Sequence, residues 1–406
     1  MRKPILGILM FFFSLPAFSQ PVLKGVMLRN VGAYLNKGDT VTIRALQKLP
    51  INLSGVMVPG DTLHYYIKDQ SGGPATSLPK NVKLLPDNLN YWERVWLLLS
   101  SESVIQSGWR RASRDTLEYN ARQQLGLLEE QNLLFHDPFL DDYFRRKLAE
   151  IHPGPMIKGP GIERHFQLKI TLLGYPRPIV YEDGTILADL SWLTGFFTEE
   201  TFMQALAEVI CHSIGDHYVK FNFYSFSDYD FTPDPGEKRY ALYFARKFMT
   251  TLPPDSSRND TLVFTRSIAP AITRAAWKHR ELREYRAAEQ LIDRLIEADI
   301  ATDETYLLKA MLLRTNPDSK AGNLAALTFL QKAERAAIHL PIPLEIPRER
   351  ALILMELGRY NEALETFEEY LEALLTGEGS YEDIRWARDM IFRCENQVVR
   401  RPSTSQ

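Results

Sequence analysis

The sequence predicts an α+β fold in three parts, and three observations carry this prediction. Residues 20–90 contain short β-branched runs between turn residues, which is the pattern of strands. Residues 91–252 mix helical periodicity with strand patterns, and residues 265–400 keep a helical periodicity almost throughout. A chain of 406 residues has room for two or three domains of this kind.

The composition is that of an ordinary globular protein. Hydrophobic residues make up 45% and charged residues 24% of the chain, which argues against extended disorder. The formal net charge is −3, and no dense block of lysine and arginine is present. The sequence therefore predicts neither a nucleic-acid partner nor attraction to an anionic membrane surface.

Residues 1–19 have the features of a signal peptide for export. Arg2 and Lys3 precede a short apolar run, and Ala17-Phe18-Ser19 forms a small-x-small cleavage site before Gln20. The run is far shorter than the roughly 20 apolar residues that a membrane-spanning helix needs, and no cysteine follows it to carry a lipid anchor. A buried N-terminal helix is the alternative. We expect an exported protein, periplasmic or secreted, with no transmembrane segment in the mature chain.

The chain has two cysteines, Cys211 and Cys394. Export would place them in an oxidising compartment, but their wide separation leaves open whether they form a disulfide. Cys211 lies in an apolar helical segment, where we expect a buried free thiol. A catalytic pair of Cys211 as nucleophile and His212 as base is not expected, because adjacent residues on a helix point about 100° apart.

Three strands are predicted in the N-terminal module. They cover Thr40–Ile43, Leu63–Lys68 and Asn81–Leu85, and the first follows the turn residues Asn36–Asp39. Their order resembles the small SH3-like barrels of exported bacterial proteins. An unrelated small β-sheet fits the same pattern, so both alternatives stay open.

The middle part alternates helices with short strands. Asp137-Pro138 separates two helical stretches, and Asp183-Gly184 is a hairpin signal between two strands. Thr198 is placed to cap a helix whose first turn is acidic. The predicted elements, in order, are helices over Asp115–Phe135 and Leu140–Ile151, strands over Phe166–Leu173, Ile179–Tyr181 and Thr185–Ala188, and a helix from Thr198 to His217 or beyond.

The stretch from Tyr181 to His217 resembles the zinc endopeptidases of peptidase family M forty-eight, the prenyl-protease and β-barrel-assembly-enhancing-protease type. Those enzymes have the same order of a hairpin edge strand with a glycine, a short helix, an acidic cap and an apolar helix that carries H-E-x-x-H. The resemblance extends over residues 115–250. It implies a gluzincin-like metallopeptidase domain, in which Thr185–Ala188 is an edge strand that takes up extended peptides by strand addition.

The H-E-x-x-H motif of that family is degenerate here, because the five positions read His212-Ser213-Ile214-Gly215-Asp216. In the intact motif two histidines on one helix face bind Zn²⁺, and the glutamate polarises the zinc-bound water. His212 keeps the first ligand position. Ser213 cannot hold a proton taken from water near neutral pH, so no catalytic residue is predicted. Asp216 can still bind zinc through its carboxylate, whereas His217 points off the shared helix face.

The family's third ligand is a glutamate on a later helix, and Glu237 stands at that position. Tyr240-Ala241 replaces the Ala-Asp that accompanies the glutamate in the family. Three states of this metal site stay open. The first is an empty site in which His212 and Asp216 form only a polar pair. The second is a bound zinc without catalysis, and the third is an active zinc protease with Glu208, one turn before His212, as the base.

The C-terminal part matches the tetratricopeptide pattern. Residues 357–367 read L-G-x-Y-x-x-A-x-x-x-F, which is the spacing of that repeat. Stacked helix pairs of this kind leave a concave surface for peptides or proteins, and a generic helical bundle is the alternative. Similar offsets recur at Leu282, Tyr285, Ala288 and Ile292, and a middle copy is predicted at Ala325 and Phe329.

These features predict an exported, catalytically inactive protein with a peptidase fold, which binds proteins or extended peptides of the cell envelope or serves as a scaffold there. The predicted binding surfaces are the strand Thr185–Ala188 and the helical repeats. The alternative is a zinc-dependent metalloendopeptidase of envelope proteins with a non-standard site. No cofactor is expected unless the metal site survives, and that cofactor would be zinc.

We predict that the mature protein begins at or near Gln20 and is recovered without detergent. The reason is a short apolar run followed by small residues, which a signal peptidase cleaves and a bilayer does not retain. Mass spectrometry of the N-terminus, after purification from an exporting host, measures this. An intact Met1 that stays with carbonate-washed membranes would contradict the prediction.

Overall fold

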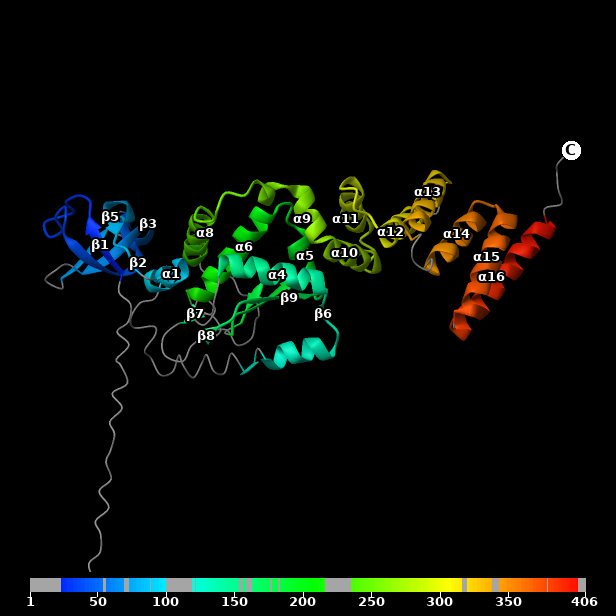
Figure 1. The fold of residues 1–406 in the computed structure, drawn as a ribbon, viewed down its shortest axis with the longest axis horizontal. Helices are drawn as coiled ribbons and strands as arrows, with labels where there is room; N and C mark the ends of the chain where they lie inside the picture. Colours follow the sequence, from blue (N-terminus) through cyan, green and yellow to red (C-terminus); the bar gives the residue numbers. More distant parts are fainter. Residues whose placement is uncertain are drawn as a thin grey trace, which may run out of the picture.

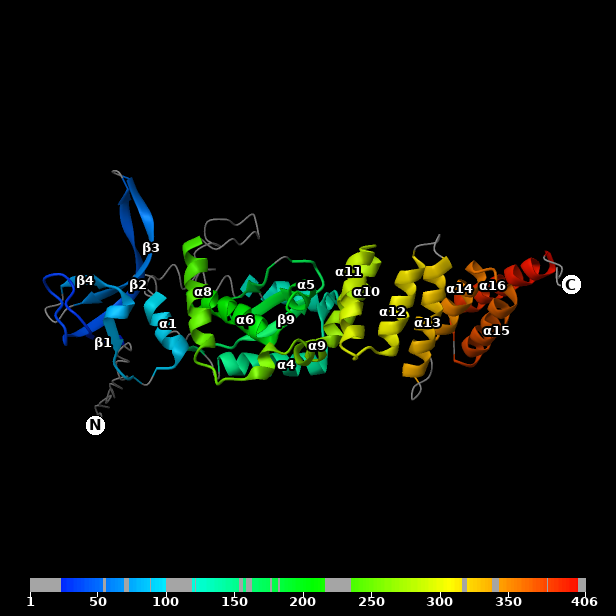
Figure 2. The same cartoon turned by 90° about the horizontal axis from the view of Figure 1, so that it is seen from above.

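A computed structural model describes residues 23–53, 56–68, 73–87, 89–99, 119–120, 122–152, 156–157, 163–175, 177–181, 183–215, 235–315, 320–337, 343–377 and 379–400. The predicted signal peptide lies outside these residues. Figures 1 and 2 show an elongated molecule with a small sheet at one end, a unit of helices and strands in the middle, and helices toward the C-terminus. The fold is α+β, as the sequence predicts.

Five antiparallel strands form the N-terminal sheet, in the order β4-β3-β2-β1-β5. The three predicted strands are confirmed, and the first two of them belong to the long β2–β3 hairpin that is visible in Figure 2. The strands are β1 (Leu23–Met27), β2 (Thr40–Leu53), β3 (Val56–Lys68), β4 (Pro74–Ser77) and β5 (Val82–Leu84).

Helix α1 (Tyr91–Leu99) joins this sheet to the middle of the molecule. Trp92 is buried, and its Nε1–H donates a hydrogen bond to the carbonyl oxygen of Ile151 at 2.7 Å. The hydroxyl of Tyr91 donates to the carbonyl oxygen of Phe244 at 2.6 Å. Because the two acceptors lie on different helices of the middle unit, α1 is held against both.

The middle unit contains a four-stranded sheet in the order β10-β11-β9-β6. β11 is parallel to β9, and the other two pairings are antiparallel. Helix α4 packs on one face of the sheet together with α6, and the helical residues 122–130 pack on the other face. The elements are β6 (Leu134–Phe135), α4 (Pro138–Ile151), β7 (Met156–Ile157), β8 (Glu163–Arg164), β9 (Gln167–Thr171), β10 (Ile179–Val180), β11 (Thr185–Asp189), α5 (Leu190–Thr194), α6 (Glu199–Ile214) and α8 (Pro235–Met249).

Strand β11 lies inside the sheet, which corrects the prediction of an edge strand at Thr185–Ala188. It pairs with β9 along its whole length and with β10 on the other side. All of its residues are buried, because Ile186 and Ala188 face the main core while Leu187 packs with the helix over 122–130. A continuous apolar run is typical of a strand that is covered on both faces. β10 therefore already occupies the side of this strand at Ile186 and Leu187, where an added peptide would have to pair.

Two predicted helix ends also shift. The first predicted helix is described over residues 122–130 and ends near Asn132, whose φ of 53° lies in the left-handed region. Leu134–Phe135 consequently forms β6 and is not helical. Helix α6 begins at the predicted cap, where the side chain of Thr198 accepts from a backbone N–H, and it ends with Gly215 as C-cap, short of His217.

One hydrophobic core runs from the N-terminal sheet through the middle unit to the first helices of the C-terminal part. At its centre, the fully buried ring of Phe202 on α6 contacts five other aromatic rings at centroid distances from 5.7 to 6.3 Å. We call this group the Phe202 cluster. Because its members come from α4, α5, α6 and α9 and from the segment between α5 and α6, it joins four helices. The other rings are those of Tyr143, Phe144, Trp192, Phe196 and Phe264.

Helices α10 to α16 form what we call the helical tail. Each helix packs against the next one in sequence, and α12 also contacts both α10 and α14. This is the contact pattern of stacked helix pairs. After the 3₁₀ turn η2 (Ser256–Asn259), the helices are α9 (Thr261–Ser267), α10 (Ala269–Glu281), α11 (Tyr285–Glu297), α12 (Asp303–Arg314), α13 (Lys320–Ala336), α14 (Glu345–Glu356), α15 (Tyr360–Thr376) and α16 (Tyr381–Arg400).

The second helix of each pair carries a buried alanine followed, four residues later, by a larger buried side chain. In the middle pair the alanine is Ala326, so the predicted copy at Ala325 and Phe329 was placed one residue too early. Ala325 and Phe329 are only partly buried. Ala325 and Ala326 are adjacent and fit the repeat spacing almost equally well in the sequence, so only their burial in the structure distinguishes them. The equivalent residues are Ala288 and Ile292 in α11, Ala326 and Leu330 in α13, and Ala363 and Phe367 in α15.

Both cysteines are free and buried, and they lie in different hydrophobic clusters. The expectation of a buried free thiol at Cys211 is confirmed, and no disulfide joins it to Cys394. Across the described residues, no helix combines the length and the apolar character that crossing a membrane requires.

The turns before α11 and α15 have the same backbone conformation. In each turn, the N–H just before the helix bonds to a carbonyl five residues earlier. The preceding residue, Arg283 in one turn and Gly358 in the other, has a positive φ of 62° or 75°. This is a Schellman motif, in which glycine is favoured because a Cβ is strained at positive φ.

We predict that Gly358→Ala destabilises α14 and α15 by about 1 kcal/mol, because alanine is strained at this φ. The matched control is Gly126→Ala, which adds a Cβ in open space within the helix over 122–130. That change should stabilise its helix by about 0.5–1 kcal/mol. Hydrogen exchange of the backbone amides in each helix measures both effects. Shifts of the same sign at the two sites would contradict the assigned conformations.

Candidate functional site

Among the predicted metal ligands, His212 is the one whose side chain the described residues include. It lies in the last turn of α6 and is 5% exposed, and Ser213 beside it is 2% exposed. Asp216 lies outside the described residues. Glu237 belongs to α8, and its side chain lies outside the described part of the chain. The structure brings α6 and α8, which carry His212 and Glu237, into direct contact.

The electrostatic surroundings of α6 near His212 are set by burial and by cations of α8. Burial raises the pKa of Glu208, one turn before His212, and the charges of Lys238 and Arg246 oppose this shift. Burial and then the charge of Lys238 lower the pKa of His212 to about 4. The imidazole is therefore neutral near pH 7, as a zinc ligand must be. The ammonium group of Lys238, however, repels a divalent cation at the same place.

No group of three or more histidine, cysteine, aspartate or glutamate side chains that could hold a metal ion occurs within the described ranges, which do not include Asp216. Among the described residues, His212 therefore has no complete set of metal ligands around it.

A buried carboxylate at the start of α6 has a structural role. Glu199 is 7% exposed and accepts a hydrogen bond from the hydroxyl of Tyr143 at 2.9 Å. It also forms an ion pair with Lys147 at 2.8 Å, and Arg258 lies 3.9 Å away. These contacts tie α6 to α4 and to η2. The sequence predicted Glu199 only as an acid of the first turn, because its partners come from segments far away in the chain.

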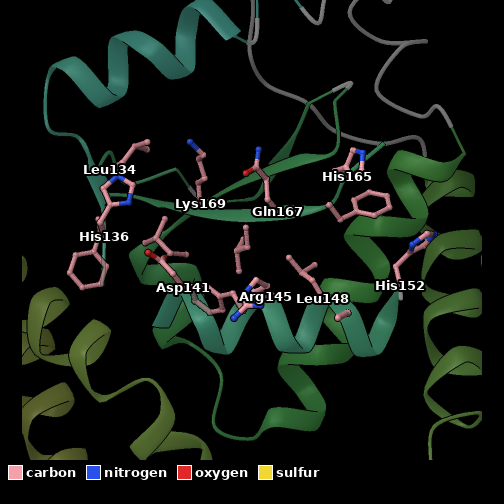
Figure 3. Close-up of a pocket in the computed structure, with 15 residues that line it drawn as sticks. Leu134, His136, Asp141, Arg145, Leu148, His152, His165, Gln167 and Lys169 are labelled. Carbon is pink, nitrogen blue, oxygen red and sulfur yellow. The ribbon is translucent and has the colours of Figure 1, made fainter. Parts of the chain in front are cut away.

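A cleft of about 530 Å³ lies between β9 and α4, as Figure 3 shows. We call it the β9–α4 cleft. Its inner wall is apolar and includes Phe144 and Leu148 of α4 and Leu168 of β9. Polar side chains also line it, namely those of His136, Asp141, Arg145, His152, His165, Gln167 and Lys169.

A larger cavity, of about 1200 Å³, lies where α5, α9 and α11 meet. Arg294 of α11 lines it, donating from Nε to the hydroxyl of Thr265 at 3.0 Å and from Nη1 to the carbonyl oxygen of Thr194 at 3.1 Å. Its guanidinium carbon lies 5.0 Å from the ring centre of Phe197. Arg294 therefore fastens the first helix pair of the tail to the middle unit.

A scan against protein-family models and a search of curated proteins both found no match for this chain. The chemistry of the candidate site is therefore inferred from its own residues. Neither the β9–α4 cleft nor the Arg294 cavity was predicted, because each is formed by segments that are distant in sequence. The sequence contains a signal for only one wall of the cleft, namely the helical spacing of apolar residues on α4, which include Phe144 and Leu148.

We predict that His212 titrates with a midpoint near pH 4 and that the protein loses stability as the pH falls from 6.5 to about 4. The unfolded chain takes up a proton in this window while the folded His212 stays neutral, so the free energy of unfolding decreases, by up to about 3 kcal/mol. NMR of ¹³C-labelled histidine measures the midpoint, and denaturant unfolding measures the stability.

The variant Lys238→Ala should raise the midpoint of His212, because it removes a nearby positive charge. The control Lys247→Ala changes a lysine of the same helix that stacks over Tyr243, and it should leave the midpoint unchanged. A His212 midpoint near 6.5 in the unmodified protein would show that the imidazole is not buried as described.

Proposed function

We propose that this chain is an exported, catalytically inactive relative of the zinc metalloendopeptidases of family M forty-eight, and that it binds proteins or extended peptides of the cell envelope. The periplasm and the cell exterior both fit this proposal. The order of elements supports the relationship: a β10–β11 hairpin with Gly184, a short α5, a Thr198 cap and the buried α6 follow one another as in that family. The gluzincin-like fold is part of the proposal.

The observation that carries the binding function is the stack of helix pairs in the helical tail, which we assign to the tetratricopeptide class. Successive helices are fixed by ion pairs as well as by apolar contacts. Lys309 of α12, 7% exposed, bonds to Glu289 and Asp293 of α11 at 2.8 and 2.7 Å. Arg314 of α12 pairs with Glu349 of α14 at 3.0 Å. A stack held in this way is ordered before a partner arrives, which reduces the entropy cost of binding.

The proposal that catalysis is lost is supported by the chemistry at the end of α6. The base position is occupied by Ser213, which is buried and cannot take a proton from water near neutral pH. Lys238 adds a positive charge close to His212. Both features disfavour a working zinc–water centre.

The alternative, a zinc-dependent endopeptidase with a non-standard site, has one observation in its favour. The packing of α6 against α8 brings the helix of Glu237 beside the helix of His212. In that alternative Glu208 replaces the missing base, and burial raises the pKa of its carboxyl above the ordinary value, which makes its carboxylate a stronger base.

We predict that the mature protein does not cleave unfolded casein, with or without added zinc. Loss of the general base alone lowers a hydrolytic rate by roughly 10²–10⁴-fold. Gel analysis and release of labelled peptides measure the activity, and His212→Ala and Glu208→Gln serve as controls. Proteolysis that a chelator stops, and that either substitution abolishes, would establish the enzyme alternative.

We predict that deleting residues 343–406 abolishes capture of envelope proteins by the mature chain. The deletion removes α14 to α16, and stacked helix pairs interact mainly with their neighbours, so the remaining fold should persist. A longer deletion that begins at residue 265 would remove α10, which contributes Ile272 and Ala276 to the main core, and is therefore unsuitable as a test. Crosslinking in an envelope extract measures capture, and circular dichroism checks folding. Equal capture by the intact and shortened chains would contradict a role of α14 to α16 in binding.

A further inference from the structure

Two arginines of the helical tail have no carboxylate partner among the described residues. Arg280 lies near the end of α10, and Arg348 lies near the start of α14. Both side chains are half-buried, and within the described part of the chain neither forms an ion pair or a side-chain hydrogen bond. Arg314 of α12 differs, since it pairs with Glu349 at 3.0 Å and with Glu356 at 3.3 Å. The first helices of the pairs thus carry a paired arginine between two unpaired ones.

Each unpaired guanidinium group is held by an indole ring. The guanidinium carbon of Arg280 lies 5.5 Å from the ring centre of Trp277, and that of Arg348 lies 4.6 Å from the ring centre of Trp386 on α16. In both groups Nε is enclosed without a hydrogen-bond partner, whereas Nη1 and Nη2 are not enclosed in this way, so solvent reaches them. Stacking restricts the orientation of the group and leaves its in-plane N–H donors free, which favours an anionic group that accepts from them.

The two arginines lie on the same part of the tail. α12 contacts both α10 and α14, and the three helices follow one another along the tail in Figure 1. Burial raises the pKa of Glu349. The charges of Arg314, Arg280 and Arg348 oppose this shift, so all three act on one carboxylate. An extended segment that crosses the three helices can therefore reach both unpaired groups.

Carboxylates elsewhere in the tail do not use the donors of Arg348. The charges of Arg348, Asp383 and Glu345 all act on the hydroxyl of Tyr370, which places the two carboxylates in the same neighbourhood. Glu345 is exposed to water, and Asp383 accepts a hydrogen bond from the hydroxyl of Ser380 at 2.6 Å. An acidic side chain of a partner would thus meet a guanidinium group whose hydrogen-bonding capacity is unused.

We propose that Arg280 and Arg348 bind an extended, acidic segment of a protein partner, with one aspartate or glutamate side chain on each arginine. The segment crosses α10, α12 and α14. The axes of packed helices lie about 8–10 Å apart, so the two acidic residues are separated by roughly 16–20 Å, which an extended chain covers in about five or six residues. This inference rests on the proposed protein-binding function of the helical tail and adds the chemistry of the partner.

The test uses the full mature chain and a fluorescent decapeptide with two glutamates at each end of a glycine–serine spacer. Fluorescence anisotropy measures its affinity, and the matched peptide has glutamines in place of the glutamates. The glutamate peptide should bind at least about tenfold more tightly, because hydrogen bonds between charged groups are the stronger ones. Its affinity should also fall as salt is added. No binding of the glutamate peptide, or equal affinities of the two peptides, would overturn the proposal.

Substitutions in the tail give the second arm of the test. Arg280→Gln and Arg348→Gln should each weaken binding of the glutamate peptide by about fivefold, and the double variant by about 25-fold, because the two contacts lie on different helices. The matched control is Arg274→Gln, which removes the same charge from an exposed side chain of α10 and should change the affinity by less than about twofold. Denaturant unfolding checks that the variants fold. Equal effects of the control and of either site variant would also overturn the proposal.

Capture of envelope proteins separates this inference from the function on which it rests. We expect capture to be lost both in the chain without residues 343–406 and in the double variant of Arg280 and Arg348. If only the shortened chain loses capture, the tail binds its partners without these arginines, and the arginine site is wrong while the binding function stands.

Discussion

The packing of the Phe202 cluster around α6 is the contact on which the middle of the molecule depends. Phe202 is fully buried and touches aromatic rings of α4, α5 and α9, so one side chain connects the helices over the sheet to the segment that leads into the tail. Truncating a buried phenylalanine of this kind costs about 3–5 kcal/mol. The ion pair of Glu199 with Lys147 and the hydrogen bond from Tyr143 fix the start of the same helix.

This constraint bears directly on function. A helix that carries a zinc motif must present its ligands to an open site, whereas α6 is buried along most of its length, including Cys211, His212 and Ser213 in its last turn. Lys238 of α8 adds a positive charge beside His212. We therefore interpret α6 as a structural support. In this interpretation, the proposed binding surface lies elsewhere, on the helical tail.

Local signals in the sequence predicted much of the fold. Thr198 with the acidic residues after it located the start of α6, and Asp183-Gly184 located the β10–β11 turn, where Gly184 has a φ of 94° and a Cβ would meet the carbonyl oxygen of His165 at 2.6 Å. Features that depend on long-range pairing were missed. The sequence of β11 does not reveal that β9 and β10 lie on either side of it, and the leucines before β6 read as helix. For the candidate site, the helical position of His212 was predictable, whereas its burial and the nearby Lys238 depend on how α6 packs against α8.

The zinc content of the mature protein tests the central claim most directly. The protein is dialysed against excess zinc and then against zinc-free buffer, and bound metal is measured by mass spectrometry beside the variants His212→Ala and Glu237→Gln. If α6 is a structural support, zinc stays far below one ion per chain and is the same in all three proteins. About one zinc per chain, lost in both variants, would show that a metal centre has been kept and would contradict the account.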